Sequence, residues 1–124
     1  MHRSQLAGFI IYCQDADLDS ASRFWSAALG LPTRPGYNAT KYVGLQTPPN
    51  GLFIEVQKVD HPSRVHLDIE TDDVEAEVQR MEKLGAKRIE KIESWWVMQA
   101  PTGHRFCVIG ARRSEFAREA NVWK

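Results

Sequence analysis

The chain has 124 residues, a length typical of one compact domain. Its composition, 43% hydrophobic and 26% charged, excludes a disordered, collagen-like or membrane-embedded chain. Sixteen basic and sixteen acidic residues cancel, so the overall charge favours neither nucleic acid nor membrane as a partner.

Cysteine content and hydropathy favour a cytoplasmic protein. The two cysteines, Cys13 and Cys107, are too few for a disulfide framework. The apolar run at residues 7–13 is shorter than the core of a secretory signal, and a membrane span needs about 18 apolar residues. We therefore predict a cytoplasmic location and no membrane or nucleic-acid partner.

The first half of the chain predicts a strand, a helix and two further strands. Residues 6–13 are β-branched and aromatic, which indicates the first strand. Apolar residues then recur at helical spacing over residues 18–29, after the capping residue Asp17 and before a glycine. Residues 41–47 and 52–59 predict the next two strands.

The second half repeats this order. Residues 64–70 alternate strictly between apolar and polar side chains, which predicts a strand with one polar face. Asp73 precedes a helix that a glycine again ends. Further strands are predicted within residues 88–99 and at 105–109, and a short terminal helix at residues 114–123.

The two halves indicate an internal duplication. Asp17 and Asp73 are 56 residues apart, and each precedes a helix that ends in Leu-Gly. Because neither half can bury its own sheet, we predict a single α+β domain in which a curved mixed sheet surrounds a ligand-binding cleft. The first module covers about residues 1–60, the second about 61–112, and a tail or short helix follows at 113–124.

Three groups of motifs stand in order along these modules. They are Arg23-Phe24-Trp25 with Leu29-Gly30, His66-Leu67-Asp68 with Leu84-Gly85-Ala86, and Ala100-Pro101-Thr102-Gly103-His104-Arg105-Phe106-Cys107. Their order and spacing resemble the vicinal oxygen chelate superfamily of glyoxalases, bleomycin resistance proteins and dioxygenases, and its glyoxalase-like subgroup in particular. The resemblance implies one domain of two βαβββ modules, a small-molecule ligand and a homodimer.

The resemblance also implies a metal ligand on the first and the last strand of each module. The first of these positions falls on Gly8 or Ile10, neither of which binds metal. The second and third fall on Glu55 and His66, which match by residue type, and the fourth, usually Glu, falls on Cys107. Glu55 and His66 are therefore the predicted metal ligands and catalytic residues. Whether a divalent metal binds stays open, because the ligand set is incomplete.

Strand alternation predicts the other side chains that line the cleft. Glu55 and His66 each oppose the apolar face of their strand. A four-residue turn at 100–103 pairs Trp96 with Cys107, so both point into the cleft. The predicted substrate-binding residues are Tyr12, Phe53, Asp68, Trp96, Met98, Arg105 and Cys107.

Two classes of function remain open within the resemblance, and an accessory domain that serves another protein is a third. The resemblance implies either a lyase, isomerase or dioxygenase relative, with His66 as general base or hydrogen-bond donor, or a protein of the bleomycin-resistance type that binds a small molecule without turnover. The incomplete ligand set argues against lactoylglutathione lyase activity. Cys107 is either a nucleophile beside His66 or a packing residue. We expect that replacing Glu55 or His66 with Ala weakens ligand or metal binding and leaves the fold intact.

Overall fold

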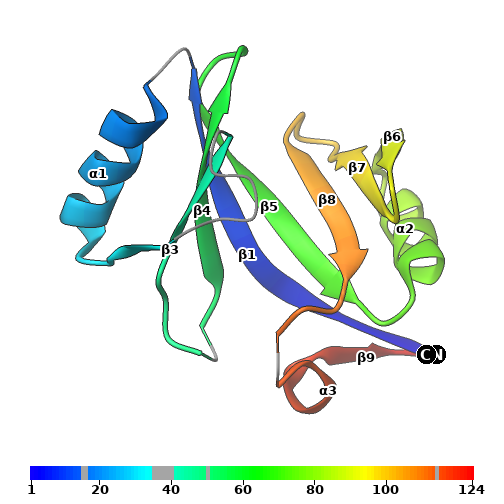
Figure 1. Cartoon of the computed structure of the whole chain (residues 1–124). Coiled ribbons are helices and arrows are strands. Elements are labelled where there is room, and N and C mark those ends of the chain that lie inside the picture. The colour runs from blue at the N-terminus through cyan, green and yellow to red at the C-terminus, as the bar shows by residue number, and fades with distance from the viewer. Residues whose placement is uncertain (15–16, 35–40, 50, 114) are drawn as a thin grey trace. The chain divides into compact units, whose positions relative to one another are not determined.

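The computed structural model describes residues 1–14, 17–34, 41–49, 51–113 and 115–124 (Figure 1). Their contacts define two units. Unit 1 comprises Met1–Ala7 and His66–Lys124, and unit 2 comprises Gly8–Val65. Strand β1 (His2–Gln14) contributes its first half to unit 1 and its second half to unit 2.

Unit 2 is a small sheet with one helix packed against it (Figure 1). Its strands are β2 (Thr33–Arg34), β3 (Tyr42–Leu45), β4 (Phe53–Val59) and the end of β1, in the order β2-β3-β4-β1. Helix α1 (Leu18–Leu29) begins after Asp17, whose carboxylate accepts a hydrogen bond from the Ser20 N–H. It ends at Gly30, whose φ of +71° favours glycine. Both helix boundaries confirm the prediction, whereas β2 is too short to produce a periodic pattern.

The core of unit 2 lies between α1 and the sheet. Leu18, Leu45 and Val56 form a buried cluster, and Ile54 packs against it. This confirms the predicted apolar face of β4. Successive side chains of a strand point to opposite faces, so Glu55 lies on the face away from α1.

Unit 1 also contains a row of strands with a helix packed against it (Figure 1). Its strands are β5 (Arg64–Thr71), β8 (Arg105–Gly110), β7 (Trp95–Gln99) and β6 (Lys87–Ile92), in the order β5-β8-β7-β6. Strand β5 begins at the end of unit 2 and runs parallel to β8. Helix α2 (Val74–Lys83) begins after Asp73, whose carboxylate accepts from the Ala76 N–H. Asp17 and Asp73 thus have the same role, as the duplication predicts.

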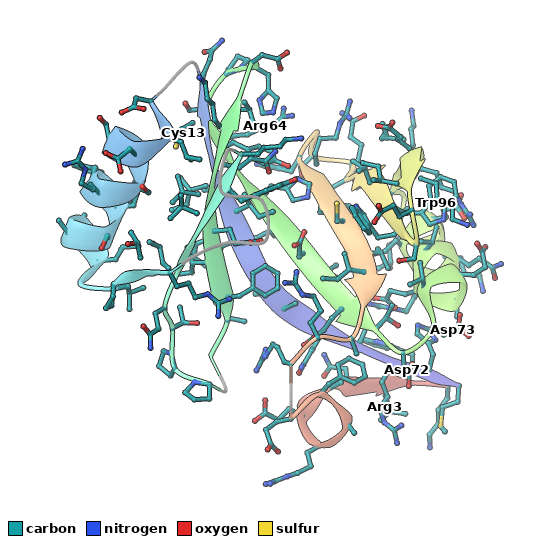
Figure 2. The ribbon with its side chains drawn as sticks, viewed as in Figure 1. Arg3, Cys13, Arg64, Asp72, Asp73 and Trp96 are labelled. Atoms are coloured by element: carbon teal, nitrogen blue, oxygen red, sulfur yellow. The ribbon has the colours of Figure 1, made fainter. Side chains whose placement is uncertain are left out.

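The buried core of unit 1 lies between α2 and the sheet. Val78 and Met81 of the helix pack against Met98, Phe106 and Val108 of the strands. Near the start of the helix, the backbone N–H of Arg3 donates to the carboxylate of Asp72 (Figure 2). This hydrogen bond fastens the beginning of β1 to the turn between β5 and α2.

The C-terminal segment differs from the predicted helix at residues 114–123. It forms a short helix, α3 (Phe116–Glu119), followed by strand β9 (Asn121–Trp123), and Ser114 lies outside the described residues. β9 pairs antiparallel with the first residues of β1, with His2 opposite Trp123. The β-branched and aromatic side chains Val122 and Trp123 suit a strand, and the open edge of β1 provides the partner. No described helix is long and apolar enough to span a membrane.

Candidate functional site

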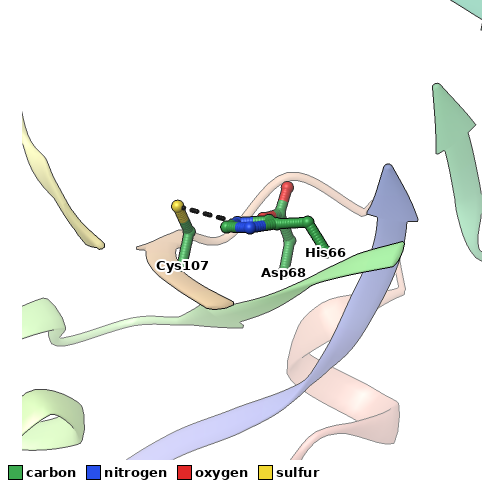
Figure 3. Close-up of side chains that lie close together, drawn as sticks. All are labelled: His66, Asp68 and Cys107. Carbon is green, nitrogen blue, oxygen red and sulfur yellow. Dashed lines mark hydrogen bonds and ion pairs between the residues drawn. The ribbon is translucent and has the colours of Figure 1, made fainter. Parts of the chain in front are cut away.

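Three titratable side chains of unit 1 meet on one face of β5 and β8 (Figure 3). His66 and Asp68 belong to β5, and Cys107 of β8 lies opposite Asp68 in the parallel register. The His66 Nε2 atom is 3.2 Å from the Cys107 Sγ atom and 3.5 Å from the Asp68 Oδ1 atom. Parallel strand pairing thus joins residues that are 41 positions apart in the chain.

The cluster is almost fully buried. The exposed fractions are 2% for His66, 5% for Asp68 and 8% for Cys107. Burial, together with the negative charge of Asp68, raises the pKa of the Cys107 thiol to about 12. Cys107 therefore keeps its proton at neutral pH and is a poor nucleophile, which argues against the nucleophilic role left open by the sequence.

The two neighbours of His66 Nε2 differ in how they share a proton. A protonated Cys107 thiol donates to Nε2 when this ring nitrogen is unprotonated. When Nε2 carries a proton, the Asp68 carboxylate is an anion close enough to attract it, because its Oδ1 atom is 3.5 Å away. The Nε2 atom therefore faces both a hydrogen-bond donor, the Cys107 thiol, and an anion, the Asp68 carboxylate.

The same atoms are suitable metal ligands. One nitrogen, one oxygen and one sulfur atom of the three side chains all lie within 4.8 Å of one another. An imidazole, a carboxylate and a thiolate form a donor set that suits Zn²⁺, whereas Mn²⁺ and Mg²⁺ prefer oxygen ligands. His66, Asp68 and Cys107 would hold such an ion, and its binding would remove the thiol proton.

The predicted partner Glu55 lies in unit 2, on the face of β4 that also carries Phe53. Its action together with His66 stays a prediction. The two positions considered for the missing ligand have different environments: Gly8 is opposite Phe53 and Ile10 is opposite Glu55. A Cβ atom at Gly8 would lie 2.2 Å from the Phe53 carbonyl oxygen, so no side chain fits there.

Two predicted cleft residues lie instead on the helix-covered face of the sheet. Met98 is fully buried in the core under α2, and Trp96 packs against that core (Figure 2). The Arg88 guanidinium lies 5.0 Å from the centre of the Trp96 ring. The prediction of Trp96 and Met98 as substrate-binding residues rested on a pairing of Trp96 with Cys107 that the structure does not have.

The difference is one residue of register in the β7–β8 hairpin. Trp96 pairs with Val108, and Val97 pairs with Cys107. The Ala100 N–H donates to the His104 carbonyl, which leaves a three-residue loop in place of the predicted four. Gly103 has a φ of +88°, the left-handed conformation that completes a three-residue hairpin loop. Shifting a strand by one residue exchanges its two faces.

The remaining predicted residues are divided between the units. Arg105 is two residues before Cys107 on β8 and so shares its face. Tyr12, at the end of β1 in unit 2, contacts the His61 ring edge to face with 5.0 Å between ring centres. Glu70, which is fully buried on the polar face of β5, is not among the predicted residues. The alternation of His66, Asp68 and Glu70 along β5 could have identified Glu70 as a member of the same polar face.

Comparison with known proteins identifies the family. The family model of the glyoxalase-like domain matches residues 10–109. The chain belongs to this family. The match confirms the resemblance to the glyoxalase, bleomycin resistance and dioxygenase superfamily and its α+β fold. No curated protein matches the chain significantly.

Several solved structures share the fold of this chain at low sequence identity. The Mn(II)-bound glyoxalase from Novosphingobium aromaticivorans is 17% identical over 92% of this glyoxalase-like chain, with a TM-score of 0.64, and the match spans only 43% of that protein. A hypothetical protein from Bacillus halodurans C-125 is 12% identical, with coverages of 90% and 98% and a TM-score of 0.66. A methylmalonyl-CoA epimerase from Streptomyces coelicolor, in complex with 2-nitronate-propionyl-CoA, is 16% identical, with coverages of 88% and 96% and a TM-score of 0.59.

Proposed function

We propose that this glyoxalase-like protein is a lyase or isomerase that acts on a small molecule by proton transfer at His66. The observation that carries the proposal is the position of the His66 Nε2 atom, 3.2 Å from the Cys107 Sγ atom and 3.5 Å from the Asp68 Oδ1 atom. An imidazole that can both accept and return a proton is the usual acid and base of such reactions.

Each member of the cluster has a distinct part in the proposed reaction. His66 removes a proton from a carbon atom next to a carbonyl group of the substrate. Asp68 stabilises the resulting imidazolium through its negative charge, since its Oδ1 atom is 3.5 Å from Nε2. Cys107 holds the ring in position. Return of the proton to the same or a neighbouring carbon completes an isomerisation, and loss of a leaving group completes an elimination.

Glu55, which the family pattern implies as a metal ligand, is proposed here as a second acid or base. Burial of the polar face of β5 excludes water and strengthens the interactions of His66. The methylmalonyl-CoA epimerase among the structural neighbours supports isomerase chemistry, because an epimerase inverts one stereocentre. A Zn²⁺ ion bound by the cluster would use His66 as a ligand, so it would polarise the carbonyl group as a Lewis acid in place of the base role of His66.

A second candidate is a protein of the bleomycin-resistance type that binds its ligand without turnover. The 2% exposure of His66 favours this alternative, because a catalytic base must reach its substrate. The two functions make different demands on the same residue. Catalysis requires proton exchange with the ligand, whereas sequestration requires affinity alone.

Hydrogen–deuterium exchange at carbon separates these functions without knowledge of the natural substrate. The protein is incubated in D₂O with a panel of small 2-oxo acids, hydroxyaldehydes and acyl thioesters, with and without added Zn²⁺. Proton NMR measures loss of the C–H signal next to each carbonyl. We expect exchange of at least one compound with the wild type and a loss of about 100-fold or more in His66→Gln.

Two further variants complete this experiment. Glu55→Ala is expected to lower the exchange rate, and Arg118→Gln is a control because its side chain is 85% exposed. Circular dichroism checks that each variant is folded. Saturable binding of a compound with no exchange would support the sequestering protein, and equal exchange in wild type and His66→Gln would refute the catalytic role of His66.

A further inference from the structure

A second polar site lies within unit 2, at the end of β1 and β4. A hollow of about 490 Å³ is lined by Tyr12, Lys41, Gln57, Lys58, Val59, Asp60 and His61. This volume is in the range of small-molecule binding pockets. Gln57 is opposite Tyr12 in the register of β1 and β4. This residue, which carries a polar amide side chain, is only 9% exposed. A polar group is therefore held in a largely buried part of the lining.

One cationic and one ionisable side chain lie beside the ring of Tyr12. The guanidinium of Arg64, which is labelled in Figure 2, lies 5.9 Å from the centre of the Tyr12 ring. The His61 ring contacts the Tyr12 ring edge to face. Lys41 is placed beside the neighbouring Tyr42, with its ammonium 5.7 Å from that ring. The aromatic rings and Val59 give the hollow an apolar lining next to these cations.

The lysines are positioned by the strand register. Tyr42 is opposite Gln57 in the antiparallel pair β3–β4, and the Lys58 N–H donates to the Lys41 carbonyl at 3.2 Å. Lys41 and Lys58 are thus cross-strand neighbours. Like charges in this arrangement repel each other and destabilise a sheet, unless an anion binds between or beside them.

The cations have no anionic partner within the described part of the chain. Lys41, Lys58 and Arg64 form no ion pair with any described residue, and Asp60 is the carboxylate of the lining. Two lysines of the lining, together with Arg64 beside Tyr12, outnumber the one carboxylate and leave a net positive charge at the hollow. This combination attracts an organic anion.

We propose that this hollow binds the carboxylate or phosphate group of a small organic molecule. Lys41, Lys58 and Arg64 supply the positive charge, and Tyr12, Val59 and His61 contact the apolar body of the ligand. The inference is independent of proton transfer at His66, because it concerns binding in unit 2 alone. Tyr12, a predicted substrate-binding residue, would thus contact a negatively charged ligand.

Titration of the full-length ¹⁵N-labelled protein with phenyl phosphate tests the proposal. We expect saturable shifts of the backbone amide signals of residues 57–61, with a Kd of about 1 mM or below. Binding weakens as NaCl is raised, because salt screens the attraction. Benzoate is expected to bind at the same amides, and neutral benzyl alcohol is expected to bind at least about tenfold more weakly than phenyl phosphate.

Charge-removing variants identify the cations that bind the anion. Lys58→Gln and Arg64→Gln are each expected to raise the Kd for phenyl phosphate by about three- to tenfold. Arg118→Gln, which removes an exposed cation of unit 1, is expected to leave the Kd unchanged. The amide spectra show whether each variant is folded. Absence of saturation, equal binding of benzyl alcohol, or an equal effect of Arg118→Gln would overturn the proposal, whatever the result of the proton-exchange experiment.

Discussion

The position of a single side chain relative to the sheet decides whether it serves the core or the site. Trp96 and Met98 lie under α2, whereas Cys107, on the strand that pairs with theirs, joins His66 and Asp68. Trp96 is further held by Arg88, whose guanidinium also binds the carboxylates of Glu75 and Glu82. Arg88 therefore joins β6 to α2 and covers the outer side of the core.

The ion pair between Glu75 and Arg88 predicts a pH dependence of stability. Hydrogen bonds from Arg88, and next from Gln79, lower the pKa of Glu75 from 4.5 to about 2. Because the folded-state pKa is depressed, this stabilisation is present above pH 4.5 and is lost as the pH falls toward 2. In Glu75→Gln, thermal unfolding should show a smaller decrease of Tm over this interval. Both groups are near solvent, so we expect a difference of about 2–4 °C. Parallel curves for the two proteins would contradict the assignment.

The donor set of the cluster predicts zinc binding. Wild-type protein should bind about one equivalent of Zn²⁺ in preference to Mn²⁺, because a thiolate and an imidazole are softer ligands than oxygen. Cys107→Ser should weaken Zn²⁺ binding by about tenfold or more in a competition titration with a chelator. Cys13→Ser is the matched control, because Cys13 packs in the core of unit 2. An equal loss in both variants would show that the cluster does not hold the ion.

At the scale of secondary structure, strand pairing limits which side chains can be present. Strands β1 and β4 of unit 2 approach closely at Gly8, where the Phe53 side chain and backbone occupy the space of a Cβ atom. A glycine is therefore required at a position where metal-binding relatives are expected to carry a ligand. Ile10, which is opposite Glu55, is the position at which this register can place a side chain beside that carboxylate.

Gly8→Ala tests this close approach. The added methyl group would lie 2.2 Å from the Phe53 carbonyl oxygen, so β1 and β4 must separate. We expect a loss of about 2–4 kcal/mol in the free energy of unfolding, measured with urea. Gly110→Ala is the control, because a methyl group there would meet no described atom within 4 Å beyond its chain neighbours. This second change should alter stability by less than about 1 kcal/mol. Equal effects would contradict the steric explanation.

At the scale of the whole chain, the C-terminal segment completes unit 1. The buried Glu70 carboxylate accepts hydrogen bonds from the backbone N–H groups of Arg112 and Arg113, at 2.7 and 2.9 Å, and from the Gln5 amide at 2.8 Å. β9 then pairs with the first residues of β1. One carboxylate on the polar face of β5 thus fastens both ends of the chain to unit 1.

Replacing this carboxylate should loosen the segment. In Glu70→Ala, the amides of residues 112, 113 and 115–123 should exchange with deuterium about tenfold faster or more, because the Arg112 and Arg113 N–H groups lose their acceptor. Glu119→Gln is the control: its carboxylate also contacts Arg113, but the side chain is 45% exposed. Unchanged exchange in Glu70→Ala, measured by mass spectrometry, would contradict the role of Glu70.

The oligomeric state remains a proposal that the family resemblance suggests. We propose a homodimer, which sedimentation equilibrium would detect as a species of twice the chain mass of 14.1 kDa. Dilution below the dissociation constant should return the monomer mass. A single species of 14.1 kDa at all accessible concentrations would exclude the homodimer.

Local patterns in the sequence determined the elements, because their causes act over a few residues. Asp17 and Asp73 accept hydrogen bonds from N–H groups three positions later, and a strand's alternation follows from its own geometry. The predicted helices, the polar face of β5 and the duplicated order of elements therefore needed no knowledge of the whole fold. The same patterns carried the family resemblance.

Tertiary structure alone decided which residues meet. His66 and Cys107 approach each other because β5 and β8 pair in parallel across 41 residues, and no local pattern specifies that pairing. The predicted pairing of Trp96 with Cys107 was wrong, because a three-residue loop and a four-residue loop place opposite faces of β7 toward the core. The core under α2 is filled in the observed register by Met98, Phe106 and Val108, and this burial of apolar surface selects that register.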